Sequence, residues 1–163
     1  MLLFTPGEVI NFALQIEKNG QAFYRALADR AEDAEAKNVF TFMANEEASH
    51  YDTFSQLGSK LTFLEPEESY PGEYAEYMRE LVESHVFTRD VNPEEMAAKV
   101  KDSVEAVNLA LGFEKDSILF FHELKKLVPA EEQCTVDGLI AEEGRHVKKL
   151  LQLKKLLSGT CDR

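Results

Sequence analysis

The sequence predicts an all-α protein: a four-helix bundle made of two repeated helical hairpins, joined by a long crossover that contains an extra short helix. Three observations lead to this prediction. Glycine and proline are sparse, with 8 and 5 among 163 residues, so few positions interrupt a helix. Apolar residues recur three and four positions apart over long stretches, which is the spacing of one helical face. The two halves of the chain also repeat each other, so each half is expected to form one hairpin.

The first hairpin is expected over about residues 5–58. Its first helix begins near Pro6, because proline suits the first turn of a helix, and runs to about Arg30. Its second helix covers about residues 34–57. We expect it to end at Gly58, because glycine is the common residue just after the last turn of a helix.

The crossover is expected over about residues 59–102. It opens with a loop that contains two prolines, and a short amphipathic helix follows over about 73–87. Asn92 then suits an N-cap, with Pro93 at the first helical position. The apolar side of the short helix is predicted to contain Tyr74, Tyr77, Met78, Leu81 and Val82. Because this apolar surface lies beyond the bundle, we expect it to support a homodimer.

The second hairpin is expected over about residues 103–158. Its helices cover about 103–128 and 129–157, and a helix of some 24 residues is ~36 Å long. A chain of 163 residues suits one domain with a sizeable core, so residues 1–163 are expected to form a single domain.

The internal repeat places identical residues at matching positions of the two hairpins. Residues 9–30 align with residues 106–127 at an offset of 97, and the identical pairs include Glu17 with Glu114. The second helices align at an offset of 96, where the word Glu-Glu-x-x-His occurs as EEASH and again as EEGRH. Two such hairpins are expected to pack about an approximate twofold axis.

Each long helix carries one glutamate in the middle of its apolar stripe. The stripes step by four and three residues, as the interior seam of a helical bundle does. Two of the helices add a histidine three residues after the glutamate, which puts both side chains on one face. The six residues are Glu17, Glu47, His50, Glu114, Glu143 and His146.

Four carboxylates in a core require neutralisation, because each buried ion costs several kcal/mol and like charges repel. Two divalent cations would cancel the four negative charges, and two neutral imidazoles would supply further ligands. Mixed oxygen and nitrogen donors suit iron or manganese. The sequence therefore predicts a two-metal site whose ligands are these six residues.

Other polar residues near the motif receive simpler interpretations. Glu46 and Glu142 lie one step off the seam and are expected at the surface, with one of them a candidate to support a ligand. His85 and His122 lack carboxylates at useful spacing, so each is expected to be a surface or core histidine.

Composition excludes several classes of function. The net charge of -12 argues against nucleic acid and anionic lipid as partners. No apolar run approaches the roughly 18 residues of a membrane span, and the start lacks the basic region of a secretory signal, so we expect a cytoplasmic protein without a membrane partner. Cys134 and Cys161 have no C-x-x-C spacing, which predicts neither a rubredoxin-type iron site nor a zinc ribbon, and no disulfide.

Four segments carry a resemblance to a known family: EKNGQAFY, EEASH, EKDSILFF and EEGRH. They resemble the rubrerythrin-like branch of the ferritin-like diiron superfamily, over all four long helices. The resemblance implies a ferritin-like bundle that holds two non-haem iron ions, with manganese or a mixed pair as alternatives. It also implies that Glu47 and Glu143 bridge the metals, that Glu17 and Glu114 are terminal ligands, and that each histidine holds one iron.

The sequence also departs from the family pattern. Rubrerythrin proper carries a rubredoxin domain that has no counterpart here, so an external, rubredoxin-like protein is the expected electron donor. Its additional glutamate after the third-helix ligand corresponds to Ser117, which weakens the expectation of redox-linked ligand exchange. The repeat counterpart of Tyr24 is Phe121. Bacterioferritin binds haem through a methionine where this chain has Ala48, so no haem is expected.

The resemblance implies an oxidoreductase that reduces hydrogen peroxide, with ferroxidase activity, in oxidative stress or iron homeostasis. Hydrogen peroxide or dioxygen would be its substrate. Three alternatives stay open: iron storage or handling, hydroxylation of an organic substrate, and a redox-silent structural module. Tyr24 lies two turns after Glu17 on the same face. It is the candidate catalytic residue, able to hydrogen-bond a ligand carboxylate or to orient peroxide, and the alternative is a core aromatic.

Overall fold

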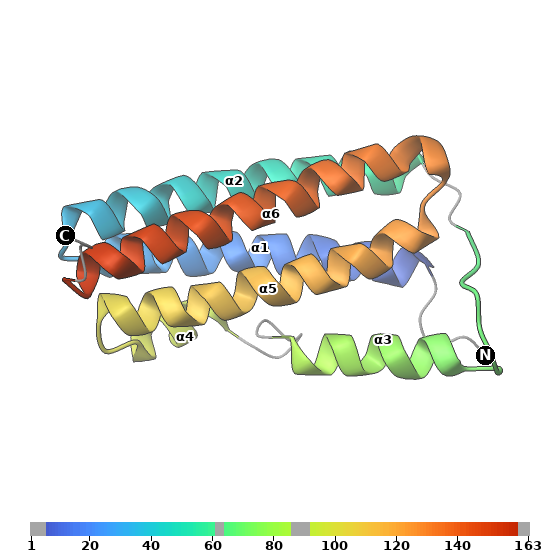
Figure 1. Cartoon of the computed structure of the whole chain (residues 1–163), viewed down its shortest axis with the longest axis horizontal. Helices are drawn as coiled ribbons and strands as arrows, with labels where there is room; N and C mark the ends of the chain where they lie inside the picture. The colour runs from blue at the N-terminus through green and yellow to red at the C-terminus, as the bar shows by residue number, and fades with distance from the viewer. Residues whose placement is uncertain (1–5, 61–63, 86–91, 160–163) are drawn as a thin grey trace.

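The computed structural model describes residues 6–60, 64–85 and 92–159, and every element within these ranges is a helix (Figure 1). The helices are α1 (Pro6–Arg30), α2 (Ala34–Lys60), α3 (Glu73–Ser84), α4 (Pro93–Lys99), α5 (Ser103–Leu127) and α6 (Ala130–Leu157). The all-α prediction is therefore confirmed. In this part of the chain no helix is both long and apolar enough to cross a membrane.

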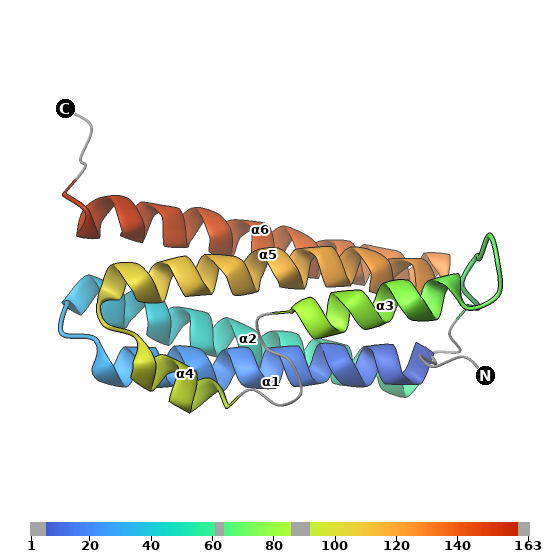
Figure 2. The same ribbon diagram turned by 90° about the horizontal axis from the view of Figure 1, so that it is seen from below.

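The four long helices form a bundle of two hairpins. The α1/α2 hairpin and the α5/α6 hairpin are the most extensive contacts, and the hairpins meet where α1 packs on α5 and α2 on α6. The crossover returns along the α1 and α5 side of the bundle, with α4 against α1 at one end and α3 at the other (Figure 2). This architecture is the predicted ferritin-like bundle with one long crossover.

The helix ends follow the predicted chemistry in most places. Asn92 caps α4 by accepting a hydrogen bond from the backbone N–H of Glu95 at 2.9 Å, as predicted, and Pro93 is the first helical residue. Asp102 caps α5 in the same way through the N–H of Glu105 at 2.8 Å. Among its described residues the crossover contains two short helices, α3 and α4. α3 ends at Ser84, and residues 86 and 87 of its expected span lie outside the described residues.

The prediction that Gly58 ends the second helix is wrong, because α2 continues to Lys60. Gly58 lies where α2 crosses α1: a Cβ atom there would lie 3.1 Å from Cγ1 of Ile10. The glycine therefore permits close helix packing and does not terminate the helix.

The apolar side of α3 is smaller than predicted. Tyr74, Met78 and Val82 are buried, but Tyr77 is 43% exposed and its hydroxyl donates a hydrogen bond to Glu123 Oε1 at 3.3 Å. A tyrosine can leave the apolar face because its hydroxyl finds a polar partner at the rim. Among the cysteines, Cys134 is exposed and has a free thiol, and Cys161 lies outside the described residues.

Candidate metal centre

The six predicted ligands lie together in the middle of the bundle, although they come from four helices and span most of the chain. They are contributed by α1 (Glu17), α2 (Glu47 and His50), α5 (Glu114) and α6 (Glu143 and His146), and none is more than 2% exposed. Each glutamate occupies an interior seam position, so the same helical spacing that builds the apolar core also delivers the carboxylates to one place.

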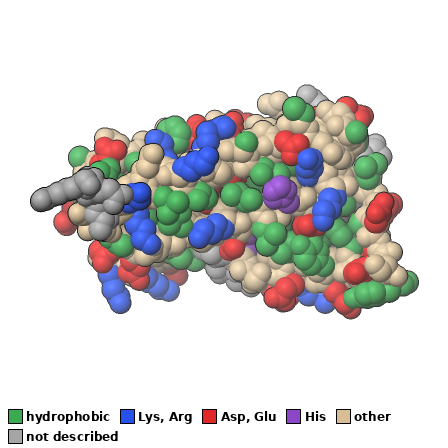
Figure 3. All heavy atoms as spheres, in the orientation of Figure 1, with side chains coloured by type: hydrophobic (Ala, Val, Ile, Leu, Met, Phe, Trp, Pro, Cys, Tyr) green, Lys and Arg blue, Asp and Glu red, His purple; other side chains and the backbone are tan. Residues whose placement is uncertain are grey.

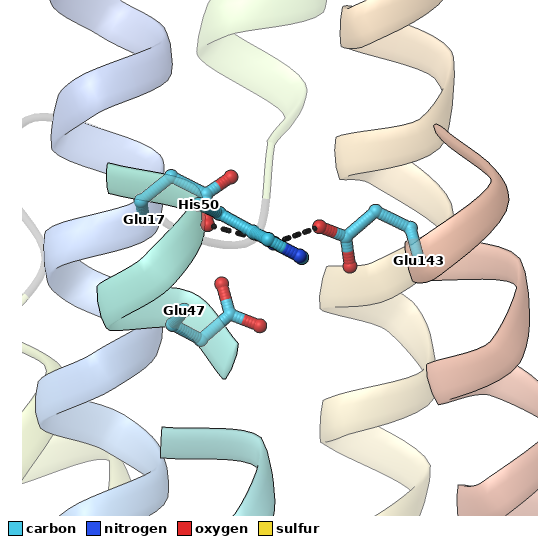
Figure 4. A group of neighbouring side chains, drawn as sticks. All are labelled: Glu17, Glu47, His50 and Glu143. Carbon is cyan, nitrogen blue, oxygen red and sulfur yellow. Dashed lines mark ion pairs between the residues drawn. The ribbon is translucent and has the colours of Figure 1, made fainter. Parts of the chain in front are cut away.

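The six residues form two overlapping groups, each with ligand atoms within 4.8 Å of one another. One group contains Glu17, Glu47, His50 and Glu143 (Figure 4), and the other contains Glu47, Glu114, Glu143 and His146. Glu47 and Glu143 belong to both groups. Two adjacent cation positions that share two carboxylates follow from this geometry.

His50 is held between the centre and the surface. Its Nδ1 faces inward, 2.8 Å from Glu143 Oε1 and 3.5 Å from Glu17 Oε2. Its Nε2 faces outward and lies 2.9 Å from Glu142 Oε2. Because Glu142 accepts from Nε2–H, it favours the tautomer whose Nδ1 is free to bind a metal.

His146 repeats this arrangement with a looser outer contact. Its Nδ1 lies 3.0 Å from Glu143 Oε2 and 3.4 Å from Glu114 Oε2. Its Nε2 lies 3.8 Å from Glu46 Oε2, beyond hydrogen-bond distance. Glu46 and Glu142 are partly exposed, as expected. Each lies near the histidine of the opposite helix, whereas the sequence predicted such a contact for only one of them.

The protonation of the metal-free centre reflects burial and crowding. Burial raises the pKa of Glu17, Glu47 and Glu114, and neighbouring carboxylates add to the rise at Glu47 and Glu114. Burial opposes the charge of Glu143 too, but hydrogen bonds with Glu114 and both histidines outweigh it and lower its pKa. Without metal, the centre therefore retains protons that offset its carboxylate charge.

The pKa values of both histidines are raised, whereas burial usually lowers the pKa of an imidazole. Burial alone would lower the pKa of His50 and His146, but hydrogen bonds with the carboxylates outweigh it. These contacts raise the pKa to about 11 at His50 and about 10 at His146. In the metal-free centre, the positive charge of the protonated imidazoles thus offsets carboxylate charge that bound cations would otherwise neutralise.

The donor atoms of the centre fit a pair of cations. Both oxygens of Glu17 and of Glu47 and Oε2 of Glu114 are buried without a hydrogen-bond partner. Buried polar atoms are normally satisfied, and several orphaned ligand atoms converging on one point indicate a missing positive partner. Two divalent ions would balance the four carboxylates.

Tyr24 lies beside this centre and is fully buried. Its hydroxyl donates a hydrogen bond to Glu114 Oε1 across the bundle. Burial, followed by the charge of Glu114, raises the pKa of Tyr24 well above its usual value, so the phenol keeps its proton. The expected contact between Tyr24 and a ligand carboxylate is present, and the ring is also part of the core. A catalytic role for Tyr24 stays a prediction.

The packing around Gly20 was not predicted. Gly20 lies on α1 between Glu17 and Tyr24, and a Cβ atom there would lie 2.6 Å from Cζ of Phe113 and 3.0 Å from Oε2 of Glu47. The glycine therefore makes room for an aromatic ring and for a ligand carboxylate. The only sequence signal was a glycine in an interior seam, where it weakens the helix.

The remaining histidines are separate from the centre. His85 is buried against the rings of Phe12 and Phe113, and burial lowers its pKa to about 4. His122 is exposed on α5. They are a core and a surface histidine, as expected.

Comparisons with known proteins agree with this geometry. The family model for rubrerythrin matches residues 8–154. A solved structure from Thermotoga maritima, described as that of a ferritin-like diiron-carboxylate protein, is 24% identical, with 93% of this chain and 95% of that chain covered and a TM-score of 0.71. This likeness shows a shared fold. No curated protein matches. Because the family match spans most of the chain and all six residues of the centre, this protein belongs to the rubrerythrin family.

Proposed function

We propose that this protein is a non-haem diiron oxidoreductase that reduces hydrogen peroxide, with ferroxidase activity in the same centre. The observation that carries the proposal is the pair of overlapping ligand groups that share Glu47 and Glu143. Sharing two carboxylates keeps the two metal positions adjacent, which suits a reaction that needs two electrons at once. Family membership supports the same reading.

The ligand roles follow from the contacts. Glu47 and Glu143 would bridge, because each belongs to both groups, while Glu17 and Glu114 would each serve one position. His50 and His146 would bind through Nδ1, since these atoms face the carboxylates. Oxygen and nitrogen donors suit iron or manganese, and we propose iron.

The chemistry consumes two electrons and two protons for each peroxide, which yields two water molecules. When bound, a ferrous pair supplies the two electrons. We propose that a rubredoxin-like electron donor restores them. The protein's own groups orient the ligands. His50 donates its Nε2–H to Glu142, and Tyr24 donates its hydroxyl hydrogen to Glu114.

The alternative of an organic hydroxylase has less support. It needs a cavity beside the metals that can hold an organic molecule. Three surface cavities of about 530, 700 and 840 Å³ lie near the helix ends and the crossover, and none of the six ligands lines any of them. A small oxidant such as hydrogen peroxide needs no such space.

We also propose a homodimer formed through the crossover face. Figure 3 shows hydrophobic side chains gathered on this side, over α3 and along α5. Exposed apolar residues of the described chain there include Leu64, Tyr70, Tyr77 and Leu119. This face suits a single contact between identical subunits, whereas a storage shell needs several distinct interfaces.

The test of function compares two oxidants. Anaerobic protein loaded with two ferrous ions per chain is mixed with equal concentrations of hydrogen peroxide or dioxygen, and the rate of iron oxidation is followed by absorbance. We expect peroxide to react faster and the iron to stay bound. The matched pair His146→Ala and His122→Ala separates the centre from the surface: the first should lose the reaction and the second should keep it.

Two outcomes would overturn the proposal. A large shell that takes up hundreds of irons per particle would favour storage. Two retained irons without any reaction toward peroxide would favour the hydroxylase or the structural alternative.

A further inference from the structure

The two halves of the metal centre hold their terminal carboxylates differently. In one half, Tyr24 on α1 donates its hydroxyl hydrogen to Glu114 on α5. The repeat counterpart of Tyr24 is Phe121, whose ring packs on Phe54 with centroids 4.7 Å apart and has no hydroxyl to offer. Neither oxygen of Glu17, the counterpart of Glu114, has a hydroxyl partner. The histidine contacts of the two halves are alike, because Nδ1 of His50 lies 3.5 Å from Glu17 Oε2 and Nδ1 of His146 lies 3.4 Å from Glu114 Oε2. The internal twofold is therefore broken at the contact that orients a ligand.

We propose that the two metal positions are inequivalent: the position served by Glu114 and His146 binds its metal more tightly than the position served by Glu17 and His50. The inference rests on the proposed two-metal function. A carboxylate already held in place loses less freedom on binding a metal than a free one does. Hydrogen bonds that orient metal ligands typically contribute about 10–100-fold in metal affinity.

A second asymmetry acts in the opposite direction and must be weighed. The outer nitrogen of His50 lies 2.9 Å from Glu142, whereas that of His146 lies 3.8 Å from Glu46. This difference favours the position served by His50. However, the Glu142 side chain is 37% exposed and is shared with Arg145 at 3.1 Å, so water and a second cation compete for it.

The buried contact outweighs the exposed one. Tyr24 and Glu114 are both fully buried, and a hydrogen bond to a carboxylate is stronger where water is excluded. Exposed contacts between charged groups contribute little, because water screens the charges. The metal at the Glu17 position is therefore the one that leaves first and is replaced first.

The test measures where the first metal binds. Metal-free protein is crystallised with one equivalent of cobalt(II) per chain, and anomalous scattering gives the occupancy at each position. We expect wild-type protein to hold cobalt at the Glu114 position with about 10-fold preference or more. Tyr24→Phe removes only a hydroxyl, and the preference should fall toward one. Tyr74→Phe is the matched control, because Tyr74 is also buried but its hydroxyl has no hydrogen-bond partner, so the preference should stay unchanged.

A cobalt titration in solution provides an independent readout. Wild-type protein should show two steps whose affinities differ by about 10-fold or more, and Tyr24→Phe should bring the steps together by weakening the tighter one. Equal occupancy in wild-type crystals, or a preference that Tyr24→Phe leaves intact, would overturn the inference while leaving the two-metal site in place. No cobalt at the six residues would overturn both.

Discussion

Replacing Gly20 by alanine is expected to destabilise the metal-free protein, although alanine is the better helix former. The new Cβ would lie 2.6 Å from Cζ of Phe113, whose ring is 1% exposed and enclosed by the core. Overpacking of this kind costs about 1–3 kcal/mol, and the gain in helix propensity is about 1 kcal/mol. The net loss is therefore up to about 2 kcal/mol, or up to about 8 °C in Tm for a chain of this size. Denaturant unfolding measures it as a lower midpoint with an unchanged slope.

The same substitution at Gly138 is the matched control. Gly138 lies inside α6, and a Cβ there would meet no atom within 4 Å, so Gly138→Ala should stabilise the protein by about 0.5–1 kcal/mol. Gly20→Ala should also weaken metal binding, because its Cβ would lie 3.0 Å from Glu47 Oε2. If both variants were stabilised equally and bound metal like wild type, the tight packing inferred around Gly20 would be refuted.

Two further predictions concern protonation and the outer contacts. The folded-state pKa values of about 11 for His50 and about 10 for His146 lie above the ordinary 6.5, so their contribution is complete below pH 6.5 and is lost as pH rises through the folded values. Urea unfolding of metal-free protein should therefore give lower stability at pH 9 than at pH 7, and the reverse order would contradict the reasoning. Glu142→Gln should weaken metal binding by up to about 5-fold, because this partly exposed contact contributes at most about 1 kcal/mol. Glu46→Gln should have a smaller effect because its contact is longer, and calorimetric titration that ranks them the other way would refute the assigned contacts.

Helical periodicity predicted the parts of the structure that depend on local spacing. The four long helices were found to within a few residues, because each carries an uninterrupted apolar stripe and has proline or a capping residue near its ends. The six residues of the centre followed from the same stripes, since a glutamate in a buried seam needs a positive partner. Such features repeat along one helix, so they are visible without knowledge of its neighbours.

Contacts between helices could not be predicted in the same way. Gly58 was expected to end a helix, but a terminal glycine and one that permits close packing against Ile10 look alike in sequence. Tyr77 was expected on the apolar face of α3, and its exposure depends on Glu123, which lies on another helix. The contact between His50 and Glu142 likewise depends on how α2 and α6 are aligned.

The number of metal ions bound per chain tests the central claim most directly. Protein reconstituted anaerobically with ferrous ion, then freed of excess metal, is analysed for iron beside the double variant Glu47→Gln/Glu143→Gln. Because both carboxylates belong to both ligand groups, we predict two irons per wild-type chain and almost none in the variant. Two irons retained by the double variant would contradict the account, because metal would then bind without the shared carboxylates.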